Sequence, residues 1–254
     1  MSTIVTGWSP KGWTEYGRRF AESFARHWPA GVSLFAYVEA PVDAPRVQCR
    51  DVLEIPGCRH FIERHGSDAF ATGRKVAPTW KAGAVKAGYN WRHDAVKFCR
   101  QGFIPADAAR KLPEGALFAW LDADVVTFSD VPAGFPFNLL PPGFDLAYLG
   151  RGAKHSEIGF QLYRNTGAAR WMLEEFAALY ATDRIFAERE QHSAFAFDLA
   201  RRRAAERVGL KAHDLTPGGR GHVWFDSPLG SCLDHLKGDR KAAGQSPERK
   251  TWKR

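Results

Sequence analysis

The residues with the clearest chemical potential are two aspartates that directly follow an apolar segment. Residues 116–121 read Ala-Leu-Phe-Ala-Trp-Leu, and Asp122 and Asp124 come next with one alanine between them. Two carboxylates so close together repel each other unless a cation lies between them. Hard divalent ions take oxygen ligands, and such an ion can also bridge a diphosphate. The pair therefore predicts a metal site, and the alternative is an Asp pair that caps the next turn.

A second group of candidates lies near the C-terminus in the pattern His-x-x-Gly-x-x-Lys. His235 can complete a metal site begun by carboxylates, because imidazole nitrogen binds many of the same divalent ions. Gly238 lets the backbone approach a phosphate closely, and Lys241 supplies a positive charge for it. The alternative is a solvated basic tail with an incidental histidine.

Together the two motifs resemble those of the GT-A glycosyltransferases, in particular the retaining enzymes of glycosyltransferase family 8. The resemblance implies that Asp122, Asp124 and His235 bind Mn²⁺ or Mg²⁺. It also implies a nucleotide-sugar donor, with a UDP-sugar expected, whose diphosphate contacts Gly238 and Lys241. The metal and these two residues would stabilise the leaving group, which is the main catalytic contribution in such a transfer. Retention of the anomeric configuration is a further implication.

The same resemblance assigns four more residues to the donor site. Thr6 and Gly7, at the end of the first expected strand, would lie near the nucleotide base and ribose. Arg92 or Lys97 would contact the donor phosphates. An exposed helical face is the alternative for this second pair.

Candidates for contacts to the reacting sugar lie between the two motifs. The family has an Asp-Gln pair there, and this chain has Glu190 and Gln191 followed by His192, so that Glu replaces Asp. At the place comparable to the family's Asn-x-Gly motif, this chain has Gly159 but lacks the Asn. Glu157 is expected to make the polar contact to donor or acceptor instead. Gln191, His192 and Glu157 are the catalytic candidates. The alternative for Gln191 and His192 is polar decoration of a helix.

The elements expected around these residues alternate between strands and helices. Strands are expected at 2–7, 33–39, 116–121, 145–149, 160–163 and 223–225, and helices at 16–28, 90–101, 166–182 and 184–208. Pro and Gly punctuation predicts that much of 40–90 is loop. The order strand, helix, strand predicts a parallel crossover unit, with ligands beyond the carboxyl ends of the strands. We predict an α/β fold: one GT-A (Rossmann-like) domain over 1–241, with a mixed, mostly parallel central sheet flanked by helices, and a basic tail at 242–254.

The charge of the chain predicts a polyanionic partner. The formal net charge is +8, and basic residues gather at 74–86, at 201–211 and in the tail. Basic surfaces attract nucleic acid and phosphorylated donors. The alternative is a solubilising face.

The whole sequence also resembles small glycosyltransferase-like proteins of tailed bacteriophages, notably in its segments 16–20, 94–98 and 216–222. This resemblance implies hydroxymethylated pyrimidines in DNA as the acceptor. A base in duplex DNA must be flipped out to reach a sugar, and Trp80 or Trp91 would then stack on it. A protein side chain, a saccharide or a small metabolite is the alternative acceptor.

The sequence also limits location and competing functions. It has no apolar run long enough to cross a membrane and no signal-peptide pattern, and its four cysteines lack the spacing of metal or redox pairs. These features predict a cytoplasmic protein, which would lie in the host cytoplasm if a phage encodes it. One competing function is a nucleotidyl- or phosphotransferase on the same carboxylates, although a P-loop motif is missing. Another is a non-catalytic DNA-binding module, which the charge favours and the complete set of metal ligands disfavours.

Overall fold

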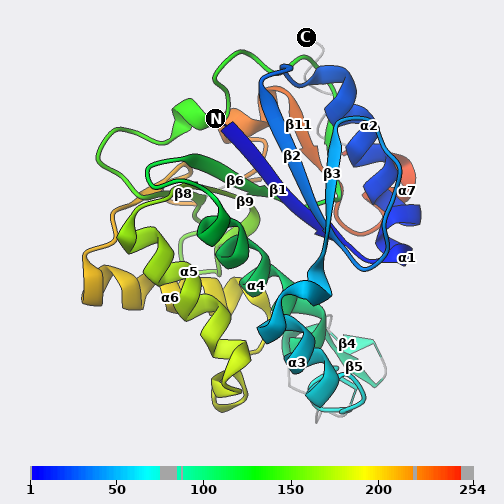
Figure 1. The fold of residues 1–254 in the computed structure, drawn as a ribbon, viewed down its shortest axis with the longest axis vertical. Helices are drawn as coiled ribbons and strands as arrows, with labels where there is room; N and C mark the ends of the chain where they lie inside the picture. Colours follow the sequence, from blue (N-terminus) through cyan, green and yellow to red (C-terminus); the bar gives the residue numbers. More distant parts are fainter. Residues whose placement is uncertain (1, 75–84, 87, 220–221, 247–254) are drawn as a thin grey trace.

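A seven-stranded sheet organises the chain, in the computed structural model that describes residues 2–74, 85–86, 88–219 and 222–246 (Figure 1). The strands, in spatial order, are β10 (Ala212–Asp214), β8 (Leu146–Leu149), β9 (Glu157–Arg164), β6 (Leu117–Leu121), β1 (Ser2–Trp8), β2 (Val32–Val38) and β3 (Val47–Asp51). Strand β9 runs antiparallel to both its neighbours, whereas the other pairings are parallel. The predicted mixed, mostly parallel α/β sheet is confirmed.

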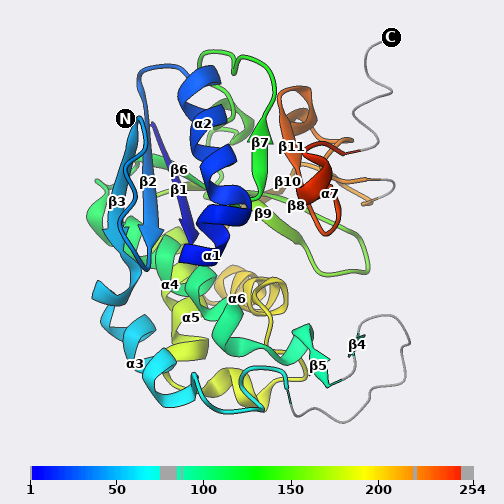
Figure 2. The same cartoon turned by 90° about the vertical axis from the view of Figure 1, so that its right-hand side faces the viewer.

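Helices cover both faces of the sheet because its central strands are apolar on both sides. In β1, Ile4 belongs to one hydrophobic core and the next residue, Val5, to the other. Side chains alternate between the faces of a strand, so two adjacent apolar residues face opposite sides of the sheet and both sides must be covered. The helix α2 (Arg18–His27) contributes to the core of Ile4. The helices α4 (Ala95–Lys111), α5 (Gly167–Ala181) and α6 (Ser193–Val208) contribute to the core of Val5 (Figure 2).

The region 40–90 contains more regular structure than its sequence predicted. It includes the edge strand β3, the helix α3 (Pro56–His65) and a short antiparallel pair of β4 (Val85–Lys86) with β5 (Tyr89–Asn90). The predicted loop is therefore wrong for these segments. Strand β3 escaped detection because it lies at the edge of the sheet and its sequence, Val-Gln-Cys-Arg-Asp, is mixed in polarity.

Two predicted helices have different bounds. Helix α4 begins after Asp94, whose carboxylate accepts a hydrogen bond from the Lys97 amide at 2.9 Å, and it continues past Gly102 and Pro105 to Lys111. The segment predicted as one helix over 184–208 contains a 3₁₀ turn at Arg184–Ala187, and α6 starts only at Ser193. Tertiary packing overrides the local preference of Gly and Pro to end a helix.

The predicted strand at 223–225 is wrong, because these residues form a turn. Its Trp224 is buried and donates its indole N–H to the Leu233 carbonyl at 2.9 Å. The strand of this region is β11 (Leu233–His235), which pairs antiparallel with β7 (Val125–Thr127). This small sheet lies beside α2 (Figure 2).

The remaining elements are short helical turns. They are α1 (Pro10–Gly12), a π-turn at Trp13–Gly17, α7 (Arg240–Ala243), and 3₁₀ turns at Val52–Glu54, Trp91–His93, Phe137–Leu139 and Pro228–Ser231. Within the described ranges, no helix combines the length and the apolar character that a membrane crossing requires.

Candidate metal and donor site

Asp122, Asp124 and His235 lie together at the carboxyl end of β6. The two aspartates occupy the connection from β6 to β7, and His235 ends β11 opposite Val125 of β7. His235 Nε2 is 2.9 Å from Asp124 Oδ1 and 3.6 Å from Asp122 Oδ2. One potential ligand atom of each residue lies within 4.8 Å of the others. The structure thus brings the three sequence-predicted ligands into one cluster.

The carboxylate of Asp122 is oriented by residues that the motif analysis did not identify. Trp120 donates its indole N–H to Asp122 Oδ1 at 2.7 Å, and the Gln101 amide donates to the same oxygen at 3.3 Å. Trp120 and Asp122 are two positions apart along an extended segment, so their side chains lie on the same side. That spacing was a usable signal for Trp120. Gln101 comes from α4, and only the packing of α4 on the sheet reveals its contact.

The two aspartates have opposite pKa shifts. Burial and the neighbouring Asp124 raise the pKa of Asp122 to about 6. Burial also opposes ionisation of Asp124, but His235 and Lys241 outweigh it and hold the pKa of Asp124 well below its usual range. Asp124 keeps its charge by pairing with cations of the protein, whereas Asp122 has too little positive charge nearby. A divalent cation would supply this charge.

Lys241 occupies the second oxygen of Asp124. Its Nζ is 3.0 Å from Asp124 Oδ2 and lies over the Tyr16 ring, 4.3 Å from the ring centroid. Arg19 of α2 donates a hydrogen bond to the Lys241 carbonyl at 2.9 Å, which ties α7 to α2. The exposed Gly238 begins this segment with a φ of +59°, a conformation that glycine adopts at little cost.

Glu157 lies behind His235 and not in an open position. Its carboxylate is 8 % exposed by residue, accepts from Lys237 Nζ at 2.7 Å, and lies 3.6 Å from His235 Nδ1. Burial opposes its ionisation, but His235 and Lys237 lower the pKa of Glu157. The other nitrogen of His235 faces Asp124, so Glu157 lies on the side of the imidazole where carboxylates are commonly found behind metal-binding histidines. A direct contact of Glu157 with donor or acceptor stays a prediction.

Gly159 leaves the space that His235 needs. A Cβ at this position would lie 2.4 Å from His235 Cε1, closer than any real contact. The Gly159 carbonyl also accepts a hydrogen bond from the Asp122 amide at 2.9 Å. The predicted importance of this glycine therefore has a steric explanation.

A second cluster forms around Glu190. Glu190 Oε2 is 2.7 Å from His192 Nε2 and 3.2 Å from His155 Nε2. The Phe195 amide donates to His192 Nδ1 at 3.4 Å, so this imidazole caps α6. A nitrogen that accepts a hydrogen bond carries no proton, which places the proton of neutral His192 on Nε2. Burial lowers the pKa of His192 to about 4 despite its bond to Glu190. His192 is thus a donor to Glu190 and the N-cap of α6, not a residue on a helix face.

Gln191 and one of the two basic candidates, Arg92, lie beside the same cluster. Gln191 Nε2 donates a hydrogen bond to the Glu188 carbonyl at 2.9 Å, and Gln191 Oε1 is hydrogen-bonded to His93 Nδ1. Arg92 Nε is 3.9 Å from Glu190 Oε2, whereas Lys97 is exposed on α4. The structure therefore places Arg92 beside Glu190. Roles for Gln191, Arg92 and Lys97 in catalysis or phosphate binding stay predictions.

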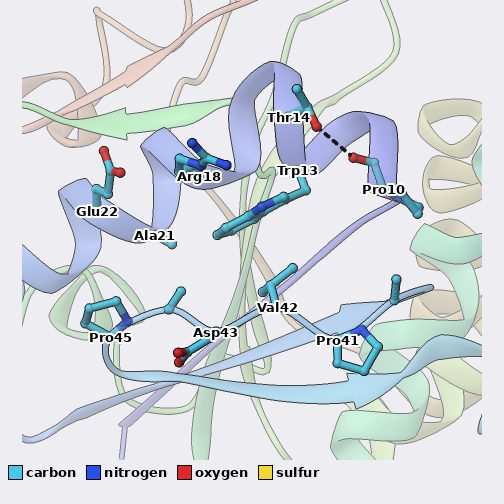
Figure 3. Close-up of a pocket in the computed structure, with 12 residues that line it drawn as sticks. Pro10, Trp13, Thr14, Arg18, Ala21, Glu22, Pro41, Val42, Asp43 and Pro45 are labelled. Carbon is cyan, nitrogen blue, oxygen red and sulfur yellow. Dashed lines mark hydrogen bonds between the residues drawn. The ribbon is translucent and has the colours of Figure 1, made fainter.

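The end of β1 leads to a cavity. Thr6 is fully buried, and its hydroxyl has no hydrogen-bond partner within the described residues, whereas Gly7 is partly exposed. Trp8 follows and packs against Trp13 with a ring separation of 5.3 Å. Trp13 lines a cavity of about 640 Å³ between the turns after β1 and the connection 40–45 (Figure 3). The cavity, and not the Thr6 side chain, is the accessible feature beside β1.

Comparison with known proteins gives structural but not sequence relatives. No family model and no curated protein matches the sequence. The structure is similar to a glycosyltransferase involved in glycosylation of the major capsid of PBCV-1, with 12 % identity, a TM-score of 0.50, and coverage of 95 % of this chain and 97 % of that one. Mouse xyloside xylosyltransferase 1 in its apo form has 10 % identity, a TM-score of 0.47 and coverage of 85 % of both chains. GlyE of Streptococcus pneumoniae TIGR4 has 12 % identity, a TM-score of 0.45, and coverage of 84 % of this chain and 46 % of that one. The first of these similarities, which spans 95 % of the chain, shows that the chain has a GT-A glycosyltransferase fold.

Proposed function

We propose that this protein is a metal-dependent glycosyltransferase that moves a hexose from a nucleotide-sugar, with a UDP-sugar as the expected donor, to an acceptor hydroxyl. The observation that carries the proposal is the meeting of Asp122, Asp124 and His235 at the carboxyl end of a central strand of this fold. Ligands of open α/β sheets bind at that edge. Family 8 membership and a phage origin stay predictions from the sequence.

The side chains at this site suit a divalent ion. Two carboxylates and one imidazole offer oxygen and nitrogen ligands, a combination that fits Mn²⁺ and, with more water ligands, Mg²⁺. When bound, the ion would neutralise charge that develops on the departing diphosphate. Trp120 and Gln101 donate hydrogen bonds to Asp122, so this carboxylate is preorganised, and Glu157 lies 3.6 Å from the His235 nitrogen that faces away from Asp124.

The proposed donor site has two parts, one for the diphosphate and one for the nucleoside. We propose that Lys241 and the Gly238 backbone bind the diphosphate, since both lie on the segment that covers Asp124. We propose that the cavity beside Trp13 binds the nucleoside, since an indole face stacks well on a base. Tyr16 lies under Lys241 and in the same π-turn as Trp13, so the two places adjoin.

The metal cluster and the donor site do not identify the acceptor. The predicted DNA acceptor rests on the net charge, on the basic groups and on the resemblance to phage proteins. Within one of those groups, however, Arg201 pairs with Asp198, and Arg203 pairs with Glu175 and Glu188. Part of the basic group at 201–211 is thus neutralised within the protein. Trp80, most of the group at 74–86 and the last eight residues lie outside the described residues. Trp91 packs against His192, with ring centroids 4.8 Å apart. Modification of DNA stays a prediction.

A donor-hydrolysis screen tests the proposed function. The protein is incubated with Mn²⁺ and a panel of nucleotide-sugars, and the nucleotide products are separated by chromatography. Release of UDP from a UDP-sugar supports the proposal, and NMR of the transferred sugar then tests retention. Pyrophosphate release from nucleoside triphosphates would instead support a nucleotidyltransferase. Salt-sensitive DNA binding without turnover of any donor would support a binding module.

A further inference from the structure

The cluster around Glu190 contains three side chains that can each offer one ligand atom to a metal ion, namely His155, Glu190 and His192. These three atoms all lie within 4.8 Å of one another. The set is separate from the candidate metal cluster at the carboxyl end of β6, which has two carboxylates and one imidazole. Imidazole nitrogen suits Zn²⁺, whereas carboxylate oxygen suits Mg²⁺ and Mn²⁺. Two imidazoles with one carboxylate therefore favour Zn²⁺.

The separations in this cluster fit one small ion. Glu190 Oε2 is 2.7 Å from His192 Nε2 and 3.2 Å from His155 Nε2. In a tetrahedral zinc site with bonds of about 2.0–2.1 Å, neighbouring ligand atoms lie about 3.3 Å apart. The three side chains therefore need to move little to surround Zn²⁺. The His155 and Glu190 side chains are 29 % and 18 % exposed, so an ion can reach them from solvent and keep a water ligand.

A carboxylate also lies behind His155, on the side away from Glu190. His155 Nδ1 is 3.7 Å from Asp198 Oδ2, whereas its Nε2 faces Glu190. The Asp198 carboxylate is buried and fixed, because it accepts hydrogen bonds from the Ser156 hydroxyl at 2.6 Å and the Ser156 amide at 3.0 Å. Metal-binding histidines commonly donate their second ring N–H to such a carboxylate, which leaves the first nitrogen free to bind the ion. A small rotation of the His155 ring would complete this arrangement.

His192 must change its tautomer to bind the ion. Its Nδ1 accepts a hydrogen bond from the Phe195 amide at 3.4 Å, and its Nε2 donates to Glu190. An ion at Nε2 takes the place of that proton, which moves to Nδ1 and ends the bond to the amide. The bond is longer than the usual range of about 2.7–3.2 Å, so its loss costs little. Metal binding should therefore free the Phe195 amide, a local change that hydrogen exchange can detect.

Arg92 is a competing cation at this cluster. Its Nε is 3.9 Å from Glu190 Oε2, near the limit of an ion pair, and its side chain is 34 % exposed. A zinc ion carries twice the charge and approaches a carboxylate oxygen to about 2.0–2.2 Å. Since attraction grows with charge and falls with distance, the ion outcompetes the guanidinium, which can turn into solvent.

We propose that His155, Glu190 and His192 form a zinc site, with water as the fourth ligand and Asp198 behind His155. His155 lies in the connection from β8 to β9, whereas the other two ligands precede α6. The ion would tie these two segments together and would fix Gln191, which lies between two ligands in the sequence. The proposal does not rest on the proposed function, because it concerns binding of Zn²⁺ and not turnover.

Zinc titration of the whole, metal-stripped protein tests this site. Asp124→Ala removes a ligand of the other cluster, so calorimetry and elemental analysis of this variant should still show one bound Zn²⁺. Adding His155→Ala should weaken that zinc by more than about 100-fold, and adding Asp198→Asn by about tenfold to 100-fold. His155 is the ligand of choice because His192 also caps α6. His60→Ala is the matched control, because His60 is exposed on α3 and belongs to neither cluster.

Hydrogen exchange gives a second readout that surface binding would not produce. Zn²⁺ should speed exchange of the Phe195 amide in Asp124→Ala, and this effect should be lost when His155→Ala is added. No bound zinc in Asp124→Ala, or equal zinc affinity with and without His155→Ala, would overturn the zinc site. Either result would leave the proposed function intact, because that function uses the other cluster. Zinc binding in Asp124→Ala, combined with no donor turnover by the wild type with Mn²⁺, would support the zinc site and count against the proposed function.

Discussion

Replacing Lys241 with methionine should strengthen metal binding and weaken donor binding. Without donor, the Lys241 ammonium lies 3.0 Å from Asp124 Oδ2 and holds an oxygen that a divalent ion would use. Removal of that ammonium frees the oxygen and removes a positive charge beside the incoming ion. With donor present, the same ammonium is expected on the diphosphate, so its loss should cost affinity there. Methionine keeps an apolar chain over the Tyr16 ring.

The size of the metal effect follows from charge, distance and exposure. Two unit charges about 4 Å apart interact by about 1 kcal/mol in water and about 4 kcal/mol near a protein surface. The Lys241 side chain is 33 % exposed, so solvent screens part of the interaction. We expect Mn²⁺ to bind Lys241→Met tighter by about 1–2 kcal/mol, or about five- to thirtyfold. Loss of the charge-assisted bond to the diphosphate should weaken UDP binding by about 1.5–3 kcal/mol.

Two titrations measure these effects. Electron paramagnetic resonance of free Mn²⁺ gives the metal affinity without nucleotide, and calorimetry at saturating Mn²⁺ gives the UDP affinity. Lys11→Met is a suitable control, because Lys11 pairs with Glu15 and its side chain is 83 % exposed. The control should leave both affinities unchanged. Weaker Mn²⁺ binding in Lys241→Met would refute the competition for Asp124, and unchanged UDP affinity would show that Lys241 does not bind the diphosphate.

Three further predictions test other parts of the structure. Asp124→Ala should abolish metal-dependent turnover and the Mn²⁺-induced rise in melting temperature while the protein stays folded; an unchanged rate that EDTA does not reduce would contradict the metal site. Gly159→Ala should weaken Mn²⁺ binding, measured by calorimetry, because its Cβ would lie 2.4 Å from His235 Cε1; equal affinity would show that the imidazole can move away freely. Burial opposes ionisation of Glu175, but hydrogen bonds from Arg184 and Arg203 outweigh the effect of burial and lower the pKa of Glu175. The charged Glu175 therefore stabilises the fold fully above about pH 4.3, the pKa of an unfolded glutamate, and this stabilisation is lost as the pH falls through the lower folded-state pKa. Urea unfolding of Glu175→Gln should therefore show a loss of about 1 kcal/mol relative to wild type at pH 7 and no loss below that folded-state pKa, whereas an equal loss at both would exclude the charge effect.

The central strands and the order of the two motifs could be predicted from the residue types alone. Residues 116–121 are apolar without interruption, which predicts a strand that is covered on both faces. Residues 2–7 contain the adjacent apolar pair Ile4 and Val5 between β-branched threonines, which also predicts a strand. The aspartates after residues 116–121, and the histidine, glycine and lysine near the C-terminus, were recognisable from residue type and spacing. The chemistry of a metal and a phosphate site could therefore be predicted before any contact was known.

Local sequence did not determine the shorter elements. Strand β3 and helix α3 lie in a region rich in Pro and Gly, and β11 has three residues, so neither periodicity nor length distinguishes them from loop. The start of α6 depends on an imidazole cap, which is rarer than a Ser, Thr, Asp or Asn cap and gives a weak sequence signal. The expected helix therefore began too early and placed His192 on a helix face.

The assembly of the site depends on contacts between segments that are distant in the sequence. Pairing of β11 with β7 brings His235 to Asp124, which lies 111 positions earlier in the chain. The same folding places Lys241 on Asp124 and buries Glu157 behind the imidazole. These contacts follow from strand register and helix packing between distant segments, and such long-range pairings leave no periodic pattern in one sequence. Residue types predicted which groups could bind a metal, and the fold decided which groups orient them.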